Sequence, residues 1–270
     1  MQHERTKPRG PLLTRCADKG FRVLEAIFAT FASTLTWSLY SSVGTLNSFR
    51  NVNFAKYILT PLDYKIPFWT FPIYGYSIAF LVIPIVAITC VWFRWQEKAH
   101  VRMVIASFFP MTLLAFLIFT LFPVSIISVK SIPDLSGMAG IDIELLRGTY
   151  AITNPWNAFP SIHIATGTLG FRLLQATFRN KAVLIFYGIW WLVMALGTLT
   201  LQYHSIADVL AGLLLAEFTF RLAKKYKSEI SNSYDAIPRT TRISLWLLFL
   251  GTLVAIHGYA SAYDLYKGTI

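Results

Sequence analysis

The chain has 270 residues, of which 55% are hydrophobic and only 14% are charged, and its formal net charge is +11. A soluble globular domain usually carries about 25% charged residues, so this deficit excludes an ordinary soluble domain and indicates an integral membrane protein. The positive charge lies between long apolar runs, which argues against a nucleic-acid surface, and two cysteines, Cys16 and Cys90, are too few for a disulfide framework.

The N-terminal half is predicted to contain three membrane spans. Residues 1–22 form a basic tail that is not a signal peptide, because the apolar run behind it is too long and lacks a small-residue cleavage site. The first span is expected at residues 21–45. Proline and aromatic residues between 47 and 73 favour an irregular segment at headgroup level over a regular helix. Spans two and three are expected at residues 73–93 and 103–122.

The longest polar connection, residues 123–159, follows the third span and is where a binding region would be expected. Within it, residues 141–150 are predicted to form a short amphipathic helix on the membrane surface. The remaining spans are expected at residues 160–178, 182–201, 205–222 and 245–263. The predicted fold class is therefore all-α, a polytopic helical membrane bundle with six core transmembrane helices and a C-terminal seventh.

The charges predict how this bundle is oriented. Eighteen of the 24 Lys and Arg residues lie in the tail and in the connections that share its side of the apolar runs. The positive-inside rule places that side in the cytoplasm, together with the N-terminus. The chain then divides into a basic cytoplasmic tail, a six-helix membrane domain, and a basic segment with the last transmembrane helix, at residues 1–22, 23–222 and 223–270.

Pro160-Ser161-Ile162-His163 opens the fourth span at the opposite, non-cytoplasmic side. Proline suits the first turn of a helix, where its missing N–H is no loss. The first-turn N–H groups and the helix dipole favour an anion there, Ser161 adds a hydroxyl donor, and His163 can donate or accept a proton. A phosphate group is the natural ligand; the alternative is a capped helix start with a buried histidine bonded to a carbonyl.

His204-Ser205-Ile206-Ala207-Asp208 opens the sixth span. Ser205 and Asp208 have the spacing of a capping box, which by itself explains the carboxylate. The alternative uses His204: a carboxylate beside an imidazole fixes its tautomer, stabilises the imidazolium and leaves the other ring nitrogen free to act. Because two spans separate the two clusters, the chain returns to the side it left, and both histidines are expected at one face of the membrane.

Ionisable groups at membrane depth indicate function, because they are costly to bury in lipid. His163, His204 and Asp208 together are more than capping requires, so they are the candidate catalytic residues. They are also metal-ligand types, but their spacing matches no compact metal motif. A transporter with a proton relay is a second class, which predicts polar groups throughout the membrane depth, whereas here they gather at one end.

Asn157-Ala158-Phe159-Pro160-Ser161-Ile162-His163 resembles the middle motif, usually Pro-Ser-Gly-His, of the type 2 phosphatidic acid phosphatase (PAP2) superfamily. His204-Ser205-Ile206-Ala207-Asp208-Val209-Leu210-Ala211-Gly212 resembles the end of its third motif, His-x3-Asp before a small-residue helix. The order of the motifs, the two spans between them and their outward placement agree as well. The resemblance covers spans two to six.

The resemblance implies a mechanism without a metal or another cofactor. His204 would attack phosphorus and form a phosphohistidine, Asp208 would orient it and stabilise its charge, and His163 would protonate the leaving oxygen. Ser161, Asn157 and the start of the fourth span would bind the phosphoryl oxygens. The substrate would be a membrane lipid, its phosphate handled at the periplasmic, lumenal or exterior face while the spans hold its tails.

The chain departs from the family pattern where arginines are expected. The third motif normally has Ser-Arg shortly before its histidine, where this chain has Gly197 and Thr198, and the first motif, Lys-x6-Arg-Pro, is not legible after the third span. Lys130 and Arg147 are the nearest basic side chains and are the candidate phosphate contacts in its place.

A branch of the family that resembles inositol-phosphorylceramide and sphingomyelin synthases also lacks these arginines. Asp63-Tyr64-Lys65-Ile66-Pro67-Phe68 is similar to bacterial and fungal members of that branch. Transfer of a phospho-headgroup to a lipid alcohol is therefore the alternative to hydrolysis. A catalytically inactive homologue with a structural or partner-binding role is a third hypothesis.

Overall fold

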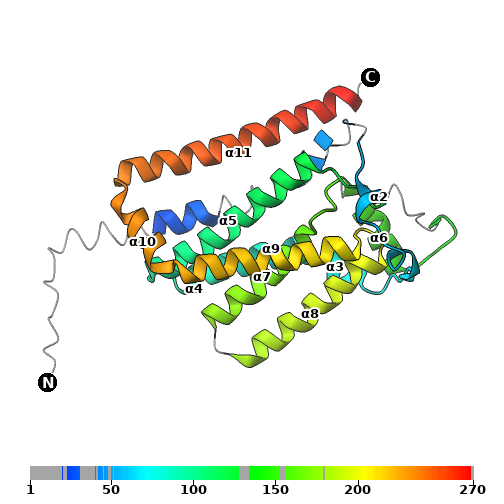
Figure 1. Cartoon of the computed structure of the whole chain (residues 1–270), viewed down its shortest axis with the longest axis horizontal. Helices are drawn as coiled ribbons and strands as arrows, with labels where there is room; N and C mark the ends of the chain where they lie inside the picture. The colour runs from blue at the N-terminus through cyan, green and yellow to red at the C-terminus, as the bar shows by residue number, and fades with distance from the viewer. Residues whose placement is uncertain are drawn as a thin grey trace, which may run out of the picture.

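The computed structural model describes residues 20, 23–30, 40, 42–44, 46, 47, 50, 52–127, 134–152, 156–178 and 180–268 (Figure 1). The basic tail and most of the first predicted span therefore lie outside the described residues, as does Lys130. Every regular element in the described part is a helix, and an isolated bridge joins Val124 to Asn157. The predicted all-α fold is confirmed.

The helices vary from single turns to long rods. Two short elements precede the main bundle, an α-helix and a 3-10 helix, and both fall in the predicted irregular segment. In chain order the elements are α2 (Ala55–Ile58), η1 (Asp63–Lys65), α3 (Ile73–Ser77), α4 (Ala79–Phe93), α5 (Lys98–Leu121), α6 (Ile141–Ile152), α7 (Ile162–Thr177), α8 (Lys181–Thr200), α9 (Ile206–Lys225), α10 (Lys227–Ala236) and α11 (Arg239–Gly268).

The predicted elements from α6 to α9 agree closely with the structure. α6 is the short amphipathic helix, and α7, α8 and α9 begin and end within a few residues of the predicted fourth, fifth and sixth spans. Three predicted spans differ. The second is interrupted at Ile78, where α3 ends and α4 begins, and α5 begins at Lys98, ahead of the predicted start at residue 103. α11 extends beyond the predicted seventh span, residues 245–263, at both ends.

Among the described residues, three helices are long and apolar enough to cross a membrane: α5, α8 and the segment Arg239–Ile256 of α11. A shorter apolar helix, Leu81–Phe93, lies within α4. These helices indicate a membrane protein. α7 has 16 residues, and most of its side chains are buried by neighbouring helices, so it presents little surface to lipid.

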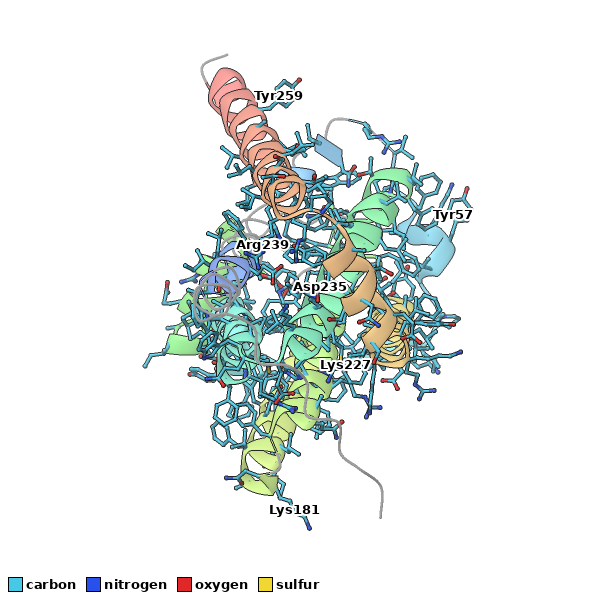
Figure 2. The ribbon with its side chains drawn as sticks, turned by 90° about the vertical axis from the view of Figure 1, so that its left-hand side faces the viewer. Tyr57, Lys181, Lys227, Asp235, Arg239 and Tyr259 are labelled. Atoms are coloured by element: carbon cyan, nitrogen blue, oxygen red, sulfur yellow. The ribbon has the colours of Figure 1, made fainter. Side chains whose placement is uncertain are left out.

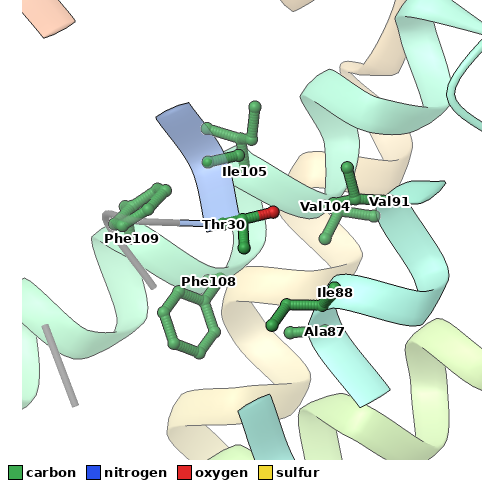
Figure 3. Close-up of a pocket in the computed structure, with 9 residues that line it drawn as sticks. Thr30, Ala87, Ile88, Val91, Val104, Ile105, Phe108 and Phe109 are labelled. Atoms are coloured by element: carbon green, nitrogen blue, oxygen red, sulfur yellow. The ribbon is translucent and has the colours of Figure 1, made fainter. Parts of the chain in front are cut away.

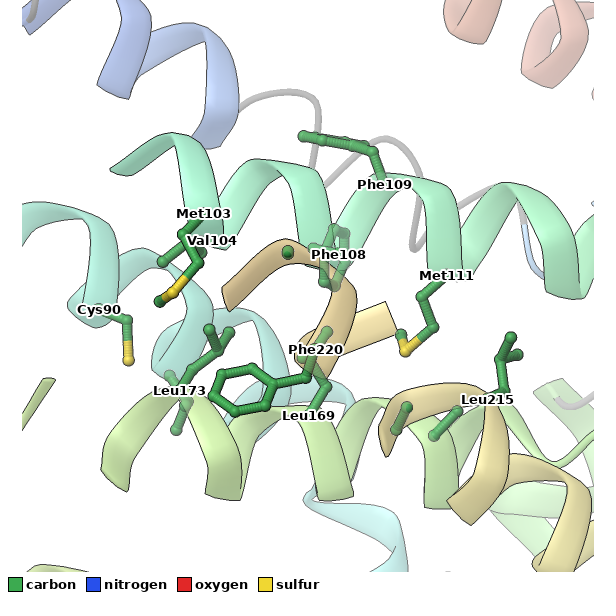
Figure 4. Close-up of a cluster of buried hydrophobic side chains, with 14 of the residues drawn as sticks. Cys90, Met103, Val104, Phe108, Phe109, Met111, Leu169, Leu173, Leu215 and Phe220 are labelled. Atoms are coloured by element: carbon green, nitrogen blue, oxygen red, sulfur yellow. The ribbon is translucent and has the colours of Figure 1, made fainter. Parts of the chain in front are cut away.

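α7 is the centre of the bundle. It packs against α4, α5, α8 and α9, and α5 packs in turn against α9 and α10. Figure 4 shows Leu169 and Leu173 of α7 beside Phe108 of α5 and Phe220 of α9. Within a membrane such contacts stabilise a bundle through close packing, because lipid tails are as apolar as the side chains themselves.

The two ends of the bundle are formed by different elements (Figure 1). The starts of α7 and α9 and the end of α8 lie at one end, near α3 and α6, whereas α10 and the starts of α5 and α11 lie at the other. α5 has 24 residues, so the ends are about 36 Å apart along it. All three predicted catalytic residues belong to the first end.

Figure 3 shows a small pocket between α4 and α5. Thr30, Ala87, Val104 and Phe108 are among the side chains that line it, and its volume is about 10 Å³. That is the space of about one water molecule. This pocket is too small for a substrate.

Candidate functional site

His163 lies in the first turn of α7, which Ser161 caps. Ser161 Oγ accepts a hydrogen bond from the Ile164 N–H at 3.4 Å, so the helix begins at Ile162 and Pro160 precedes it. The prediction that Pro160 occupies the first turn is wrong. A serine hydroxyl can satisfy a first-turn N–H group, which a proline side chain cannot, and the serine therefore sets the start of the helix.

His204 lies in the turn between α8 and α9. Its backbone N–H donates to the Thr198 carbonyl at 2.9 Å, and its Nδ1 lies 2.9 Å from the Ala158 carbonyl oxygen. A carbonyl oxygen only accepts, so this contact requires the proton on Nδ1. The second ring nitrogen, Nε2, then carries the lone pair that a nucleophile or a base needs.

Asp208 closes the predicted capping box at the start of α9. Ser205 Oγ accepts from the Asp208 N–H at 3.2 Å, and Asp208 Oδ2 accepts from the Ser205 N–H at 2.7 Å, so the capping box is confirmed. The same Oδ2 lies 3.4 Å from His204 Nδ1. Because His204 precedes the helix, the two side chains meet across the turn and not along a shared helix face.

His163, His204 and Asp208 form one buried group, called the histidine cluster below. The imidazole centroids are 6.0 Å apart and the ring planes are inclined at 64°. His163 and Asp208 are 0% exposed and His204 is 2% exposed. The two-span separation in the sequence thus corresponds to close contact at one end of the bundle.

Tyrosine rings pack against the histidine cluster. Tyr76 of α3 stacks on His163 with centroids 4.6 Å apart, and Tyr203 stacks on Tyr76 at 5.0 Å. Tyr40 meets the His163 ring edge-on at 5.9 Å. These rings orient His163 and limit the access of water to it. The sequence patterns missed them, because a tyrosine in an apolar run carries no signal of the ring that it will contact.

Asp63, a second buried carboxylate, holds the start of α9. It is 0% exposed; its Oδ1 accepts from the Ile206 N–H at 2.7 Å, and its Oδ2 accepts from the backbone N–H and the hydroxyl of Thr60, both at 2.7 Å. A carboxylate at a helix N-terminus is stabilised by the helix dipole. Asp63 therefore joins the irregular N-terminal segment to the helix that carries Asp208. The two bonded residues are 143 positions apart, and no local pattern connects them.

α7 and α9 approach each other closely beside the histidine cluster. The Ser161 N–H donates to the Asp208 carbonyl at 3.0 Å. A Cβ atom at Gly212 would lie 2.5 Å from the Ser161 carbonyl oxygen, which is closer than atoms in contact can come. Gly212 therefore permits the approach that places Asp208 beside the first turn of α7.

Two predicted phosphate contacts have structural partners. Ser161 Oγ faces the first turn of its own helix, although its hydroxyl proton remains available as a donor. The side-chain Nδ2 of Asn157 donates to the backbone carbonyl of Tyr40. The backbone carbonyl of Asn157 accepts from the Tyr40 hydroxyl at 3.5 Å. Asn157, 1% exposed, thereby fixes Tyr40, whose ring contacts His163.

Arg147, one of the two basic candidates, is engaged away from the histidine cluster. Its guanidinium donates to Glu144 and to the carbonyls of Leu135 and Met138. These bonds tie α6 to the loop before it. The structure therefore does not bring Arg147 to the histidines, and Lys130 lies outside the described residues.

The positions where the family pattern has Ser-Arg are tightly packed. Thr198 is 0% exposed, and its hydroxyl donates to the Ala195 carbonyl at 2.7 Å. A Cβ atom at Gly197 would lie 3.2 Å from the Pro72 carbonyl oxygen. An arginine has no room at position 198 in this packing, so the positive potential for an anion must come from elsewhere.

The histidine cluster offers chemical groups suited to covalent transfer of an anion. His204 Nε2 supplies a lone pair, His163 can supply a proton, and Asp208 supplies a negative charge against His204. The first-turn N–H groups of α7 add the positive end of a helix dipole. Within the described part of the chain, no three His, Cys, Asp or Glu side chains are grouped so that they could hold a metal ion.

Comparison with known proteins places the same region in a family. The family model described as the PAP2 superfamily matches residues 65–222, a stretch that contains the whole histidine cluster. No curated protein and no solved structure matches the chain.

Proposed function

Because the chain belongs to the PAP2 superfamily, we propose that it is an integral membrane enzyme that cleaves a lipid phosphate ester through a phosphohistidine. The observation that carries this proposal is the meeting of His163 and His204, whose ring centroids are 6.0 Å apart, with Asp208 Oδ2 3.4 Å from His204 Nδ1. Two imidazoles at this separation can contact opposite sides of one phosphoryl group.

The first step forms the covalent intermediate. The lone pair on His204 Nε2 attacks phosphorus, and the bond from phosphorus to the lipid oxygen breaks. Protonated His163 gives its proton to that oxygen, so the lipid leaves as a neutral alcohol. His204 becomes positively charged, and the Asp208 carboxylate stabilises that charge while the Ala158 carbonyl holds Nδ1–H in place.

The second step releases the phosphoryl group. His163, now neutral, takes a proton from the attacking water while the water oxygen forms a bond to phosphorus. The bond from phosphorus to His204 Nε2 breaks, the lone pair returns to the imidazole, and inorganic phosphate leaves. His163 ends the cycle protonated, so each histidine is restored.

The phosphoryl oxygens need donors, and the two helix starts differ in what they offer. At the start of α9, the N–H groups of Ile206 and Asp208 already donate to Asp63 and Ser205. The start of α7 is therefore the proposed phosphoryl site: the Ile164 N–H donates to Ser161 Oγ, and the Ile162 N–H and the Ser161 hydroxyl are the proposed donors.

A second candidate function is transfer of a phospho-headgroup to a lipid alcohol, whose hydroxyl would replace water in the second step. The observation that favours it is the burial of the histidines, 0% and 2% exposed, beneath stacked tyrosine rings. A site closed to bulk water is poorly suited to hydrolysis, and in the transfer reaction the acceptor alcohol would enter the site together with the lipid substrate. The absence of arginine at Gly197 and Thr198 agrees with this alternative.

The arrangement in the membrane is part of the proposal. The N-terminus lies in the cytoplasm, the histidine cluster faces the opposite, extracytoplasmic side, and seven helices cross the bilayer. The six-helix membrane domain spans residues 23–222, preceded by the basic tail and followed by the basic segment with the last transmembrane helix. The partner is a membrane lipid, and no nucleic acid or cofactor takes part.

The decisive experiment traps the intermediate. Purified protein is incubated with a radiolabelled lipid phosphate and quenched in alkali, where a phosphohistidine survives although acid destroys it. Label is expected on the wild type and not on His204→Ala. A wild-type protein that turns over substrate without acquiring base-stable label would refute the covalent mechanism.

The acceptor is identified in the same preparation. Release of inorganic phosphate is measured with and without added diacylglycerol or ceramide. Hydrolysis predicts phosphate release that is independent of the added alcohol. Transfer predicts little phosphate release and a new phospholipid that appears only when the alcohol is present.

A further inference from the structure

A continuous series of ring contacts leads from α6, the helix in the connection between α5 and α7, to His163. Tyr150 of α6 contacts Tyr203 with ring centroids 4.9 Å apart, and Tyr203 stacks on Tyr76 at 5.0 Å with the ring planes inclined at 11°. Tyr76 stacks in turn on His163 at 4.6 Å. All three separations are in the range of favourable aromatic pairs. The rings of Tyr150, Tyr203 and Tyr76 are called the tyrosine stack below.

The inner part of the tyrosine stack is buried. Tyr76 and Tyr203 are 0% and 4% exposed and belong to one hydrophobic cluster, against which the partly buried Tyr150 packs. Because protein interiors are close-packed, a ring that moves must move the rings that it touches. A change at Tyr150 is therefore transmitted by contact through Tyr203 and Tyr76 to the imidazole of His163.

Tyr150 is itself held in a defined place. The Thr70 hydroxyl, just ahead of α3, donates to the Asp142 carboxylate in the first turn of α6. Leu146, one turn before Tyr150, is 0% exposed in the same cluster as the inner rings. The Tyr150 hydroxyl donates to the Leu201 carbonyl at the end of α8 at 2.8 Å. These contacts fix α6 against both α3 and α8.

The ring and the hydroxyl of Tyr150 lead to different histidines. The ring leads through the tyrosine stack to His163, whose own ring is oriented by aromatic contacts. The hydroxyl leads to the turn that carries His204, but hydrogen bonds to the carbonyls of Ala158 and Thr198 already hold that residue. The ring is therefore the part of Tyr150 that matters most to the site.

We propose that Tyr150 is a positioning residue for His163 and acts through the rings of Tyr203 and Tyr76. This inference rests on the proposed function, in which His163 gives a proton to the leaving oxygen. Proton transfer requires the donor within hydrogen-bond distance of that oxygen, so a small displacement of the imidazole lowers the rate of the step that needs the proton. The helix between α5 and α7 would thus contribute an aromatic ring to catalysis and not the guanidinium of Arg147.

The test uses two substrates and two variants of the full-length protein in detergent. Phosphatidic acid has an alkyl leaving group that needs a proton, whereas para-nitrophenyl phosphate has an aryl leaving group that does not. Tyr150→Leu removes the ring and the hydroxyl, and Tyr150→Phe keeps the ring and removes only the hydroxyl. Values of kcat and KM are measured for each variant on each substrate, and melting temperatures are recorded beside them.

Tyr150→Leu is expected to lower kcat on phosphatidic acid by about three- to tenfold, the range of one aromatic contact, and to leave kcat on para-nitrophenyl phosphate nearly unchanged. Tyr150→Phe should behave as the wild type on both substrates. Equal losses on the two substrates, or no loss on either, would overturn the inference. So would a loss in Tyr150→Phe as large as that in Tyr150→Leu, because the hydroxyl and its turn would then carry the effect.

Tyr187 of α8 provides the matched control. It is 5% exposed, its ring lies 5.0 Å from that of Trp190, and its hydroxyl donates to the Gly167 carbonyl at 3.0 Å. It lies near Lys181, where α8 begins (Figure 2), whereas the histidine cluster lies at the other end of this helix. Tyr187→Leu should affect the two substrates alike. A selective loss on phosphatidic acid here would mean that any weakened packing produces it, and the inference would fail.

Two further comparisons separate the possible failures. If Tyr150→Leu does not fold, Tyr150→Met takes its place, because a flexible methionine fills an irregular gap without a ring. His163→Ala is measured on the same pair of substrates. If it distinguishes them and the variants of Tyr150 do not, the inference fails alone. If it does not distinguish them, or if the wild type turns over neither substrate, the proposed function fails and the inference with it.

Discussion

His204 is fixed from outside its own turn. Its ring donates to the Ala158 carbonyl and its backbone to the Thr198 carbonyl, so segments before α7 and at the end of α8 both determine where Nε2 points. His163 is fixed differently, by the face of Tyr76 and the edge of Tyr40. These aromatic contacts set the orientation of the ring, which suits a residue that donates and recovers a proton at a fixed place.

The separate roles proposed for the two histidines can be tested with substrates whose leaving groups differ in their need for a proton. His163→Ala is expected to lower kcat on a lipid alkyl phosphate by about 10²–10⁴-fold, because the alkoxide then leaves without a proton. On an aryl phosphate, whose phenolate needs no proton, the loss should be much smaller. His204→Ala should abolish turnover of both substrates, because it removes the atom that attacks phosphorus. Steady-state kinetics with paired substrates gives the comparison.

The melting temperatures of both variants must first be shown to lie close to that of the wild type. Equal losses on the two substrates for His163→Ala would rule out its role as the proton donor. Activity of His204→Ala near the wild-type level would remove the phosphohistidine route altogether.

Asp63 acts on the histidine cluster through the start of α9. Asp63→Ala removes a buried acceptor that joins the backbone N–H groups of Thr60 and Ile206, so the free energy of unfolding should fall by about 1–3 kcal/mol. Turnover should fall as well, because the helix that carries Asp208 loses its anchor. Thermal denaturation and kcat are measured on the same preparation.

Asp134 provides the matched control for Asp63. Its carboxylate also accepts from a nearby backbone N–H, that of Ser136 at 2.9 Å, but the group is fully exposed. Asp134→Ala should leave both the melting temperature and kcat close to their wild-type values. Comparable effects from the two substitutions would contradict the anchoring role of Asp63.

The residues that the sequence could identify are those whose partners lie nearby in the chain. The capping box of Ser205 and Asp208 follows from their spacing, and the meeting of His163 with His204 follows from the two apolar runs between them. Asp63 and Tyr76 were missed because their partners are defined only after the helices pack. The predicted role of Arg147 found no support for a different reason: Glu144, one turn away on the same helix, pairs with its guanidinium.

At the level of elements, the contact between α7 and α9 determines the geometry of the site. Gly212→Val places a branched side chain where even a Cβ atom would lie 2.5 Å from the Ser161 carbonyl oxygen. The two helices must separate, which should cost about 1–3 kcal/mol of stability and move Asp208 away from α7. Melting temperature and kcat should both fall.

The same substitution at Gly251 is the control, since nothing lies within 4 Å of a Cβ atom built there on α11. Gly251→Val should leave turnover unchanged. If Gly212→Val were as active as Gly251→Val, the close approach of α7 and α9 would not be needed for catalysis.

The break between α3 and α4 is a helix boundary that the sequence pattern did not predict. The predicted second span is one apolar run, and nothing in that pattern marks a break at Ile78. The break accompanies a contact with α8: Trp190 Nε1 donates to the Gly75 carbonyl at 3.0 Å, and a Cβ atom at Gly75 would lie 2.8 Å from a Val193 methyl group. The Gly75 carbonyl accepts from this indole, and a side chain inserted into the hydrogen bonds of a helix interrupts it. Hydrophobic periodicity does not predict such a contact, because it depends on how the helices pack.

On the scale of the whole molecule, the two ends differ in charge. Basic residues are in excess at the end formed by α10 and the starts of α5 and α8, whereas charges of both signs lie at the end with the histidine cluster. The basic group includes Arg94, Lys98, Lys181, Lys224 and Lys227. At the other end, Asp63, Asp134, Asp142 and Glu144 lie in the same segments as Lys56, Lys65 and Arg147. This asymmetry is the structural counterpart of the charge pattern that predicts orientation.

The basic end should make stability depend on pH. The Arg102 guanidinium, which donates to Asp235, holds the pKa of this carboxyl below its usual range. A carboxyl whose pKa is lower in the folded state contributes stability above its unfolded pKa of about 3.9 and loses it as pH falls through the folded value. The melting temperature of the wild type should therefore fall faster than that of Asp235→Asn between about pH 5 and pH 3. Parallel slopes for the two proteins would show that the ion pair does not stabilise the fold.

The proposed orientation can be measured with an impermeant thiol reagent on intact cells. Cys16→Ser removes one native thiol, and Cys90 is buried and should not react. Tyr64, 62% exposed, adjoins Asp63 and so marks the end of the bundle with the histidine cluster, whereas exposed Lys225 at the end of α9 marks the other. Because the basic end is expected in the cytoplasm, Tyr64→Cys should be labelled on intact cells and Lys225→Cys only after permeabilisation. The reverse pattern would place the histidine cluster on the cytoplasmic side, and the lipid phosphate would then have to be presented from the inner leaflet.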